Sequence, residues 1–169
     1  RLYKNDGRGN FSIDASSFSS NSMNISVATS YDYDSDGDED LFVGAGSVPF
    51  VYGQVPKSYL FQNDGKGHFR DVAPPSLGYA GMITGAVWVD VNSDGRKELI
   101  VTGEWMSPKI FSYHSGSFEE LKTTGLENLY GWWQSIASGN VNGDGREDLI
   151  LGNIGENFYL RPDEKNPVK

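Results

Sequence analysis

The sequence predicts an all-β protein made of repeated units, each of four antiparallel strands and the size of one β-propeller blade. Three observations support this prediction. Acidic loops begin at positions 32, 90 and 140, a hairpin motif alternates with them, and a short apolar segment follows each loop. The loop spacing gives a period of 58 and then 50 residues, so the 169-residue chain holds about three blades of a larger propeller.

The best-formed acidic loop runs from Asp32 to Asp40 and carries oxygen-bearing side chains at positions one, three, five and nine. Gly37 stands at position six, because glycine tolerates the positive φ that a tightly curled loop needs. Four carboxylates this close repel one another unless water or a cation screens them. Calcium, which takes six to eight oxygen ligands, suits such a loop, and a solvated acidic hairpin is the alternative.

Two degenerate copies of this loop argue against a chance match. They span residues 90–98 and 140–148 and keep the same ligand positions and the same glycine. An EF-hand is excluded, because its loop needs a bidentate glutamate at position twelve and a helix after it. Position twelve here is an apolar residue in a β-rich segment: Val43, Val101 and Leu151.

A second motif, Asn-Asp-Gly-x-Gly between apolar residues, occurs within residues 2–11 and 60–69, with a worn copy at 110–118. In both full copies the aspartate lies 26 residues before an acidic loop. Asn, Asp and Gly tolerate the left-handed backbone of a tight turn, so the motif predicts a β-hairpin. A metal site in this motif is disfavoured, because it holds only one carboxylate.

Each full unit is expected to contain strands A to D, with the acidic loop joining A to B. The expected A strands are 25–31, 85–89 and 134–138, the B strands 41–44, 99–102 and 149–152, the C strands 58–61 and 109–112, and the D strands 68–72 and 117–121. This organisation places a blade end at 1–14, blades at 24–73 and 83–121, and an incomplete blade at 132–161. No stretch has convincing helical periodicity.

The composition narrows the classes of partner. The net charge of −9 argues against nucleic acid, although much of the acid sits in the predicted metal loops. The absence of cysteine excludes a disulfide framework and a cysteine nucleophile, and it fits a bacterial exported protein. No apolar run reaches the length of a membrane helix, so membrane insertion is not expected.

The acidic unit between two strands resembles the FG-GAP or VCBS repeat of the integrin α-subunit propeller. The segments 87–90 (Val-Trp-Val-Asp) and 103–106 (Gly-Glu-Trp-Met) are more similar to bacterial relatives of the cartilage acidic protein branch. The resemblance covers nearly the whole chain. It implies a seven- or eight-bladed extracellular propeller, with calcium in the loops of one face and ligands meeting the opposite face.

Carried onto this sequence, the resemblance implies up to three structural calcium sites. The side-chain ligands would be Asp32, Asp34, Asp36 and Asp40 in the first site, Asp90, Asn92, Asp94 and Glu98 in the second, and Asn140, Asn142, Asp144 and Asp148 in the third. Residue seven of each loop would supply its backbone carbonyl: Asp38, Arg96 and Arg146. The carboxylates number four, three and two, so calcium affinity is expected to fall from the first site to the third.

The predicted function is a non-catalytic, calcium-stabilised module outside the cell or at its surface that mediates adhesion. Its partner would be a protein or a glycan on the face opposite the calcium loops. Fewer than four blades cannot close a ring, so the rest of a larger propeller or a second copy is expected to complete it.

A carbohydrate-binding or polysaccharide-acting enzyme segment is the alternative function. Aromatic residues in the expected loops are candidates for stacking on sugars, although packing between blades is the competing interpretation: Trp105, Tyr130, Trp132 and Trp133. His68 and His114 are interpreted as turn or strand residues rather than bases. No catalytic triad, phosphate loop or zinc triad is apparent in the sequence.

Overall fold

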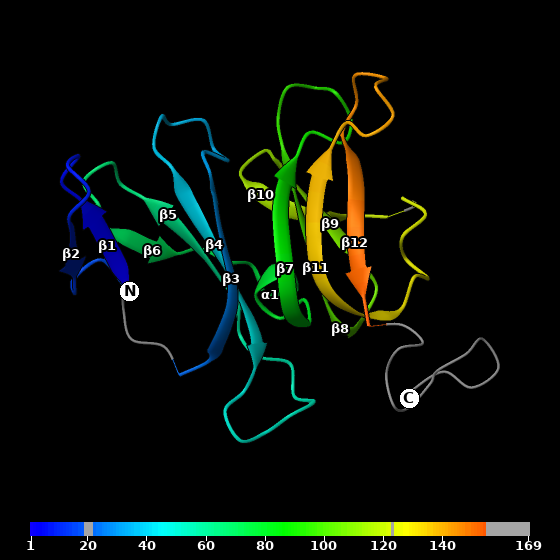
Figure 1. Cartoon of the computed structure of the whole chain (residues 1–169), viewed down its shortest axis with the longest axis horizontal. Coiled ribbons are helices and arrows are strands. Elements are labelled where there is room, and N and C mark those ends of the chain that lie inside the picture. The colour runs from blue at the N-terminus through cyan, green and yellow to red at the C-terminus, as the bar shows by residue number, and fades with distance from the viewer. Residues whose placement is uncertain (19–21, 123, 155–169) are drawn as a thin grey trace.

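The computed structural model describes residues 1–18, 22–122 and 124–154. These residues form twelve strands and one short helix (Figure 1). In chain order the elements are β1 (Leu2–Asn5), β2 (Phe11–Asp14), β3 (Asn24–Tyr31), β4 (Asp40–Ser47), β5 (Tyr59–Asn63), β6 (Phe69–Asp71), α1 (Pro75–Gly78), β7 (Met82–Val89), β8 (Glu98–Met106), β9 (Lys109–His114), β10 (Ser117–Leu121), β11 (Gly131–Gly139) and β12 (Asp148–Asn153). The prediction of an all-β fold with antiparallel sheets is confirmed.

Two successive stretches of the chain form four-stranded meanders. The strands β3, β4, β5 and β6 pair in chain order, and β7 to β10 do the same. The second and third strands pair in the same register in both meanders, Leu41 opposite Phe61 and Leu99 opposite Phe111. The repeat seen in the sequence is therefore also a structural repeat.

The two ends of the described chain form smaller units. β1 and β2 make a separate two-stranded sheet, and β11 pairs with β12. The start of β11 also pairs with the end of β8, with Gly131 opposite Met106 and Trp132 opposite Glu104, which joins two repeats into one sheet. The sequence did not predict this link. The part of the expected unit 132–161 that follows Ile154 lies outside the described residues.

The first strands of successive repeats, β3, β7 and β11, lie next to one another along one side of the molecule (Figure 1). The Ser26 hydroxyl donates to the Ile83 carbonyl, and the Thr84 hydroxyl donates to the Trp133 carbonyl at 2.6 Å. A Cβ added at Gly85 would lie 2.9 Å from the Ile136 side chain, so glycine is needed there for the close approach.

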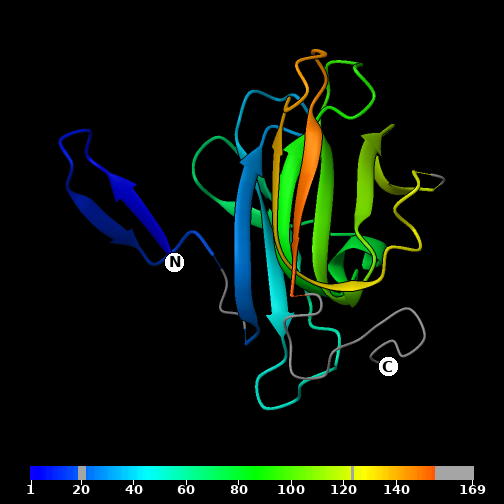
Figure 2. The same ribbon diagram turned by 45° about the vertical axis from the view of Figure 1, so that its right-hand side comes forward.

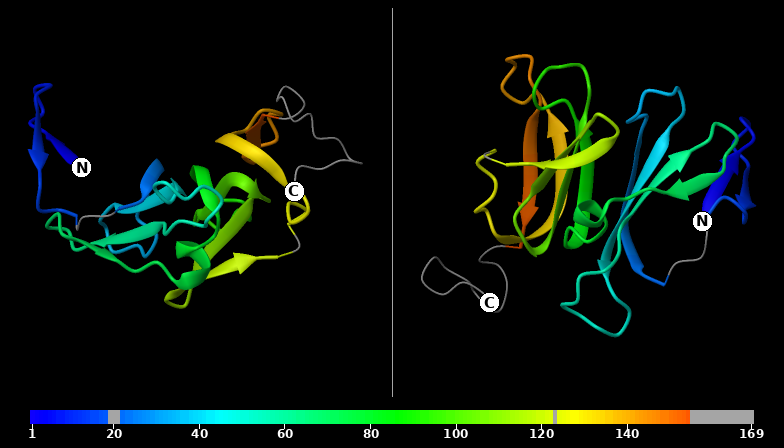
Figure 3. Two further views of the ribbon diagram at one scale, coloured as in Figure 1. Left: turned by 90° about the horizontal axis from the view of Figure 1, so that it is seen from below. Right: turned by 180° about the vertical axis from the view of Figure 1, so that it is seen from behind.

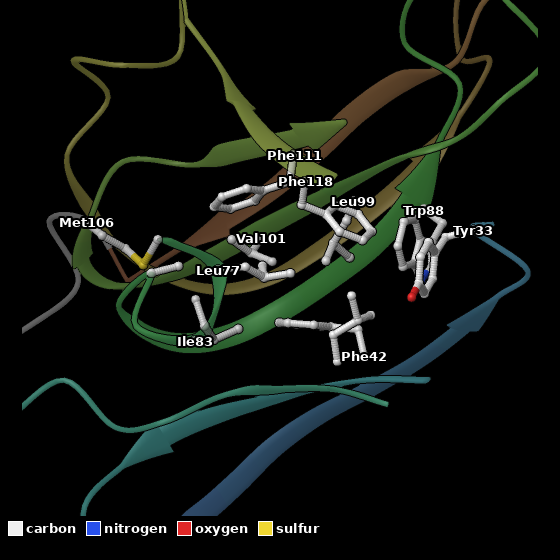
Figure 4. Packing of buried hydrophobic residues seen from close by; sticks show 12 residues of the cluster. Tyr33, Phe42, Leu77, Ile83, Trp88, Leu99, Val101, Met106, Phe111 and Phe118 are labelled. Carbon is white, nitrogen blue, oxygen red and sulfur yellow. The ribbon is translucent and has the colours of Figure 1, made fainter. Parts of the chain in front are cut away.

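The main core lies between the two meanders (Figure 4). Leu99 and Val101 of β8 belong to this cluster with Phe42 of β4, whereas Ile100 between them belongs to a second cluster facing β11 and β12. Successive strand side chains point to opposite faces, so β8 is buried on both faces at residues 99–101, and this part of its sequence is continuously apolar. Each such fully buried side chain contributes about 1.5–3 kcal/mol.

The one helix in the described residues, α1, spans four residues, too few to show helical periodicity in the sequence. Pro74 is extended, with φ −66° and ψ 156°, and Pro75 stands at the start of the helix, where its missing N–H and fixed φ cost nothing. Leu77 is fully buried in the main core, so tertiary packing holds a turn too short to show periodicity. Within the described residues, no helix is long and apolar enough to cross a membrane.

The three acidic loops project from the same edge of the molecule, at the top of Figure 1, and the turned views agree (Figures 2 and 3). They follow β3, β7 and β11, which run in the same direction. The connection after β4 and the start of β11 lie at the opposite edge. The repeat topology therefore places the acidic loops at one edge and these two segments at the other.

Candidate metal centre

The acidic loops share one backbone design. The residue at position six has positive φ, as predicted, at Gly37, Gly95 and Gly145. Position four is left-handed as well, with φ values of 61° at Ser35 and Ser93, and this was not predicted. The side chain at position three accepts the N–H of residue five, and the side chain at position five accepts the N–H of residue seven, in all three loops. These bonds fold the side chains at positions three and five back onto the backbone of their own loop.

The first loop brings three carboxylates together. One oxygen each from Asp32, Asp34 and Asp40 lies within 4.8 Å of the other two. Asp32 accepts N–H bonds from residues five and six of the loop at 3.1 and 3.0 Å. Asp36 is exposed and bonds the Asp38 N–H at 3.0 Å, so the structure holds it in the loop but outside the carboxylate cluster.

Asp40 is the most unusual member of this cluster, because its side chain is 1% exposed. Its Oδ1 accepts the Asn63 N–H from β5 at 2.9 Å. Its Oδ2 is buried and, in the described part of the chain, has no hydrogen-bond partner of standard geometry. Burial raises the pKa of Asp40 to about 6; the charges of Asp34 and Asp36 add to the rise, while the backbone N–H groups of Asn63 and Tyr33 oppose it. An ionised buried carboxylate with an unpartnered oxygen is costly unless it takes up a proton or binds a cation.

The second loop satisfies its buried carboxylate in a different way. Glu98 is also 1% exposed, but it accepts the Val91 N–H at 3.1 Å and the Ser112 hydroxyl at 3.1 Å. The Asn92 amide donates to both Asp94 and Glu98, at 3.0 and 3.4 Å. Hydrogen-bond donors of the protein therefore occupy the Glu98 oxygens that a cation would otherwise bind.

His114 is a member of the second cluster that the sequence interpretation missed. One ligand atom each from Asp94, Glu98 and His114 lies within 4.8 Å of the other two. The His114 ring also contacts the Ser112 hydroxyl at 2.6 Å. Asp90 is instead engaged by the Asp94 and Gly95 N–H groups. The only signal for His114 was its place in the worn hairpin copy, two residues after the expected C strand, and sheet pairing brings it to the loop.

The third loop has the weakest acidic character. Asn140 accepts the Gly143 and Asp144 N–H groups through one amide oxygen, because an amide cannot offer the second acceptor that Asp32 and Asp90 use. The Arg146 guanidinium lies 3.1 Å from the Asp144 carboxylate. Asp148 accepts the Val141 N–H at 3.0 Å and is half-buried. Asn140 lacks the charge of an aspartate, and the Arg146 guanidinium balances part of the charge of Asp144. Less negative charge is therefore left for a cation to balance.

The hairpin motif supports the first loop, which the sequence interpretation did not anticipate. The Gln62 amide donates to Asp34 Oδ2 at 2.7 Å, and the Asn63 amide donates to the Glu39 carbonyl at 3.2 Å. A Cβ added at Gly65, whose φ is 71°, would collide with the Asp38 carboxylate. The predicted turn chemistry is correct, with Asp64 accepting the Lys66 and His68 N–H groups. The glycine also leaves room for the neighbouring loop.

The repeated meanders, each with an acidic loop between its first two strands, define an all-β protein of antiparallel repeats. Comparison with protein-family models matches the FG-GAP-like repeat at residues 32–101 and 90–151, which together exceed half of the chain. The chain belongs to this family, as the sequence resemblance predicted. Comparison with curated proteins gives no match.

Proposed function

We propose that the protein is a calcium-binding propeller module and that its calcium is structural. The observation that supports this proposal best is the Asp40 carboxylate, buried beside Asp32 and Asp34 with one oxygen unpartnered in the described structure. Oxygen-only ligands at close range suit a hard cation such as calcium. Asp36 and the Asp38 carbonyl are proposed to complete the first site, and the corresponding residues 90–98 and 140–148 to form weaker ones.

The proposed role of the ion follows from what its ligands hold. Asp34 is the third residue of the loop after β3 and Asp40 is the first residue of β4, and both bond to residues of β5. An ion bound by Asp32, Asp34 and Asp40 would therefore fix the first three strands of a repeat to one another. It would also neutralise carboxylates whose mutual repulsion opposes folding.

We further propose that the module binds a partner and does not catalyse a reaction. The loop carboxylates, which a hydrolase would need as acid and base, are largely engaged in backbone hydrogen bonds. The binding surface is proposed to be the edge opposite the loops. An extracellular location would suit such sites, because millimolar calcium fills sites of modest affinity.

Thermal unfolding in calcium and in chelator tests the structural role. Calcium at about 100 times its Kd stabilises a protein by about 2.7 kcal/mol, which corresponds to a melting temperature shift of roughly 5–10 °C for a chain of this size. Asp40→Asn is expected to remove most of that shift. Glu39→Gln, which changes an exposed neighbour, is the matched control and should keep it. An unchanged melting temperature for the wild-type protein in calcium would refute the structural role.

A further inference from the structure

Segments from three successive repeats meet at the edge opposite the acidic loops (Figures 1 and 3). They are the 48–57 connection after β4, the end of β8 and the start of β11. Their side chains form one bonded group, named here the Trp105 cluster: Tyr52, Glu104, Trp105, Trp132 and Gln134.

A chain of hydrogen bonds orders the polar part of the Trp105 cluster. The Trp105 indole N–H donates to the Tyr52 hydroxyl at 2.9 Å, and that hydroxyl donates to Glu104 Oε2 at 2.6 Å. The Gln134 amide donates to Glu104 Oε1 at 3.3 Å. Both oxygens of Glu104 are therefore held in place by residues that come from the neighbouring repeats.

The aromatic part of the cluster is held in a strained and exposed position. Trp105 has φ of 61°, a left-handed conformation that is strained for a bulky residue. Its ring packs against Trp132 with centroids 5.0 Å apart and an interplanar angle of 35°, yet Trp105 stays 36% exposed. Tyr52 is 62% exposed. Burying the ring cannot account for this backbone strain, because the ring stays partly in solvent. Strain of this kind concentrates at functional sites.

The polar groups of the cluster have hydrogen-bonding capacity to spare. A carboxylate offers about four lone-pair sites, and the bonds described above use two of those on Glu104. The Gln134 carbonyl oxygen and its second amide hydrogen are additional groups on an exposed residue. The cluster therefore combines aromatic surface with ordered acceptors and a donor.

We propose that the Trp105 cluster binds a neutral glycan. The indole and phenol rings offer apolar surfaces for the C–H face of a sugar ring, and Glu104 and Gln134 offer partners for its hydroxyl groups. A carboxylate at the centre of the site and a net charge of −9 disfavour anionic sugars. This inference deepens the proposed function, because it assigns a ligand class and residues to the edge opposite the calcium loops.

Direct binding to defined sugars tests the inference. The full chain in calcium is titrated calorimetrically with neutral oligosaccharides of glucose, xylose, mannose and N-acetylglucosamine, and with oligogalacturonate as the anionic comparison. Binding of at least one neutral probe is expected. Trp105→Gly should weaken it at least tenfold; glycine relieves the strain of the positive φ, which offsets part of the packing lost against Trp132, and thermal unfolding of the variant in calcium checks that it is folded. Glu104→Gln should weaken it several-fold.

Tyr3→Ala, on the separate β1–β2 sheet, is the matched control: it removes a similarly exposed aromatic residue and should leave sugar binding unchanged. Three results would overturn the inference: no neutral probe binds, only oligogalacturonate binds, or Trp105→Gly binds as well as wild type. The calcium-induced melting shift is measured on the same samples. A normal shift without sugar binding rejects the glycan inference alone, whereas a missing shift rejects the calcium proposal.

Discussion

Replacing Asp40 with Asn is expected to stabilise the calcium-free protein and to destabilise the calcium-bound one. The Asp40 side chain is 1% exposed, and burial is the main cause of its pKa of about 6. An aspartate in an unfolded chain titrates near pH 3.9. The folded state therefore holds this proton more tightly than the unfolded state does.

The sign of the pH dependence follows from that difference. Because folding raises the pKa, the proton on Asp40 contributes to the free energy of unfolding, and this contribution is fully present below about pH 4. The free energy of unfolding then falls as pH rises through about 6, where a buried carboxylate ionises. A difference of about two pKa units corresponds to about 3 kcal/mol. Asn has a similar shape but does not titrate, so calcium-free Asp40→Asn should exceed wild type by up to that amount above about pH 7.

Calcium should reverse the order of the two proteins. A cation beside Asp32, Asp34 and Asp40 favours the ionised carboxylate, and at about 100 times its Kd it adds about 2.7 kcal/mol to wild type. The variant lacks one ligand and should gain much less. The crossing of the two stability curves distinguishes a metal site from a buried acid with no ligand.

Urea unfolding from about pH 4 to pH 8, in chelator and in calcium, measures this effect. The difference between wild type and Asp40→Asn isolates one carboxylate, because the other titrating groups are common to both proteins. A pH-independent difference in chelator would refute the raised pKa. A variant that is less stable than wild type at pH 8 in chelator would refute the argument that one oxygen of the ionised side chain lacks a partner.

Three further predictions concern the repeats. Asn140→Asp should raise calcium affinity at the third loop at least tenfold, about 1.4 kcal/mol, because it restores a carboxylate at position one; calorimetry measures it. Gly85→Ala should cost about 1–3 kcal/mol in urea unfolding, because the added Cβ would lie 2.9 Å from Ile136. Phe42→Ala should cost about 3–5 kcal/mol in the same assay, because Phe42 is fully buried between the sheets.

Each of these three predictions has a control within the chain. Asp144→Asn should weaken the third loop where Asn140→Asp strengthens it, and equal effects would contradict the charge argument. A Cβ added at Gly139 has no other atom within 4 Å, so Gly139→Ala should change stability much less than Gly85→Ala. Phe50→Ala removes a fully exposed ring, so a cost comparable to that of Phe42→Ala would contradict the core assignment.

Local sequence was sufficient to predict the strands and their turns. The acidic loops and the Asn-Asp-Gly turns depend on residues within ten positions of one another, and their hydrogen bonds link residues two to five apart. Turn chemistry of this kind needs no tertiary contact. The apolar run from Leu99 to Val101 likewise indicated a strand, although only the packing shows that both of its faces are buried.

The contacts that complete the candidate sites depend on packing between segments distant in the chain. Gln62 reaches Asp34 across 28 residues, and Trp105 reaches Tyr52 across 53. His114 approaches Asp94 and Glu98 because β9 pairs beside β8. No short-range pattern encodes such distances, because they are set by sheet register and by how one repeat packs on the next.

The sequence by itself determined the repeat, the acidic loops as candidate calcium ligands and the family. The tertiary structure decided which of those ligands converge: it buries Asp40 with an unpartnered oxygen and supplies Glu98 with internal donors. The reason is physical, because side-chain type and spacing are local properties, whereas burial and the partners of a carboxylate belong to the packed sheets around it.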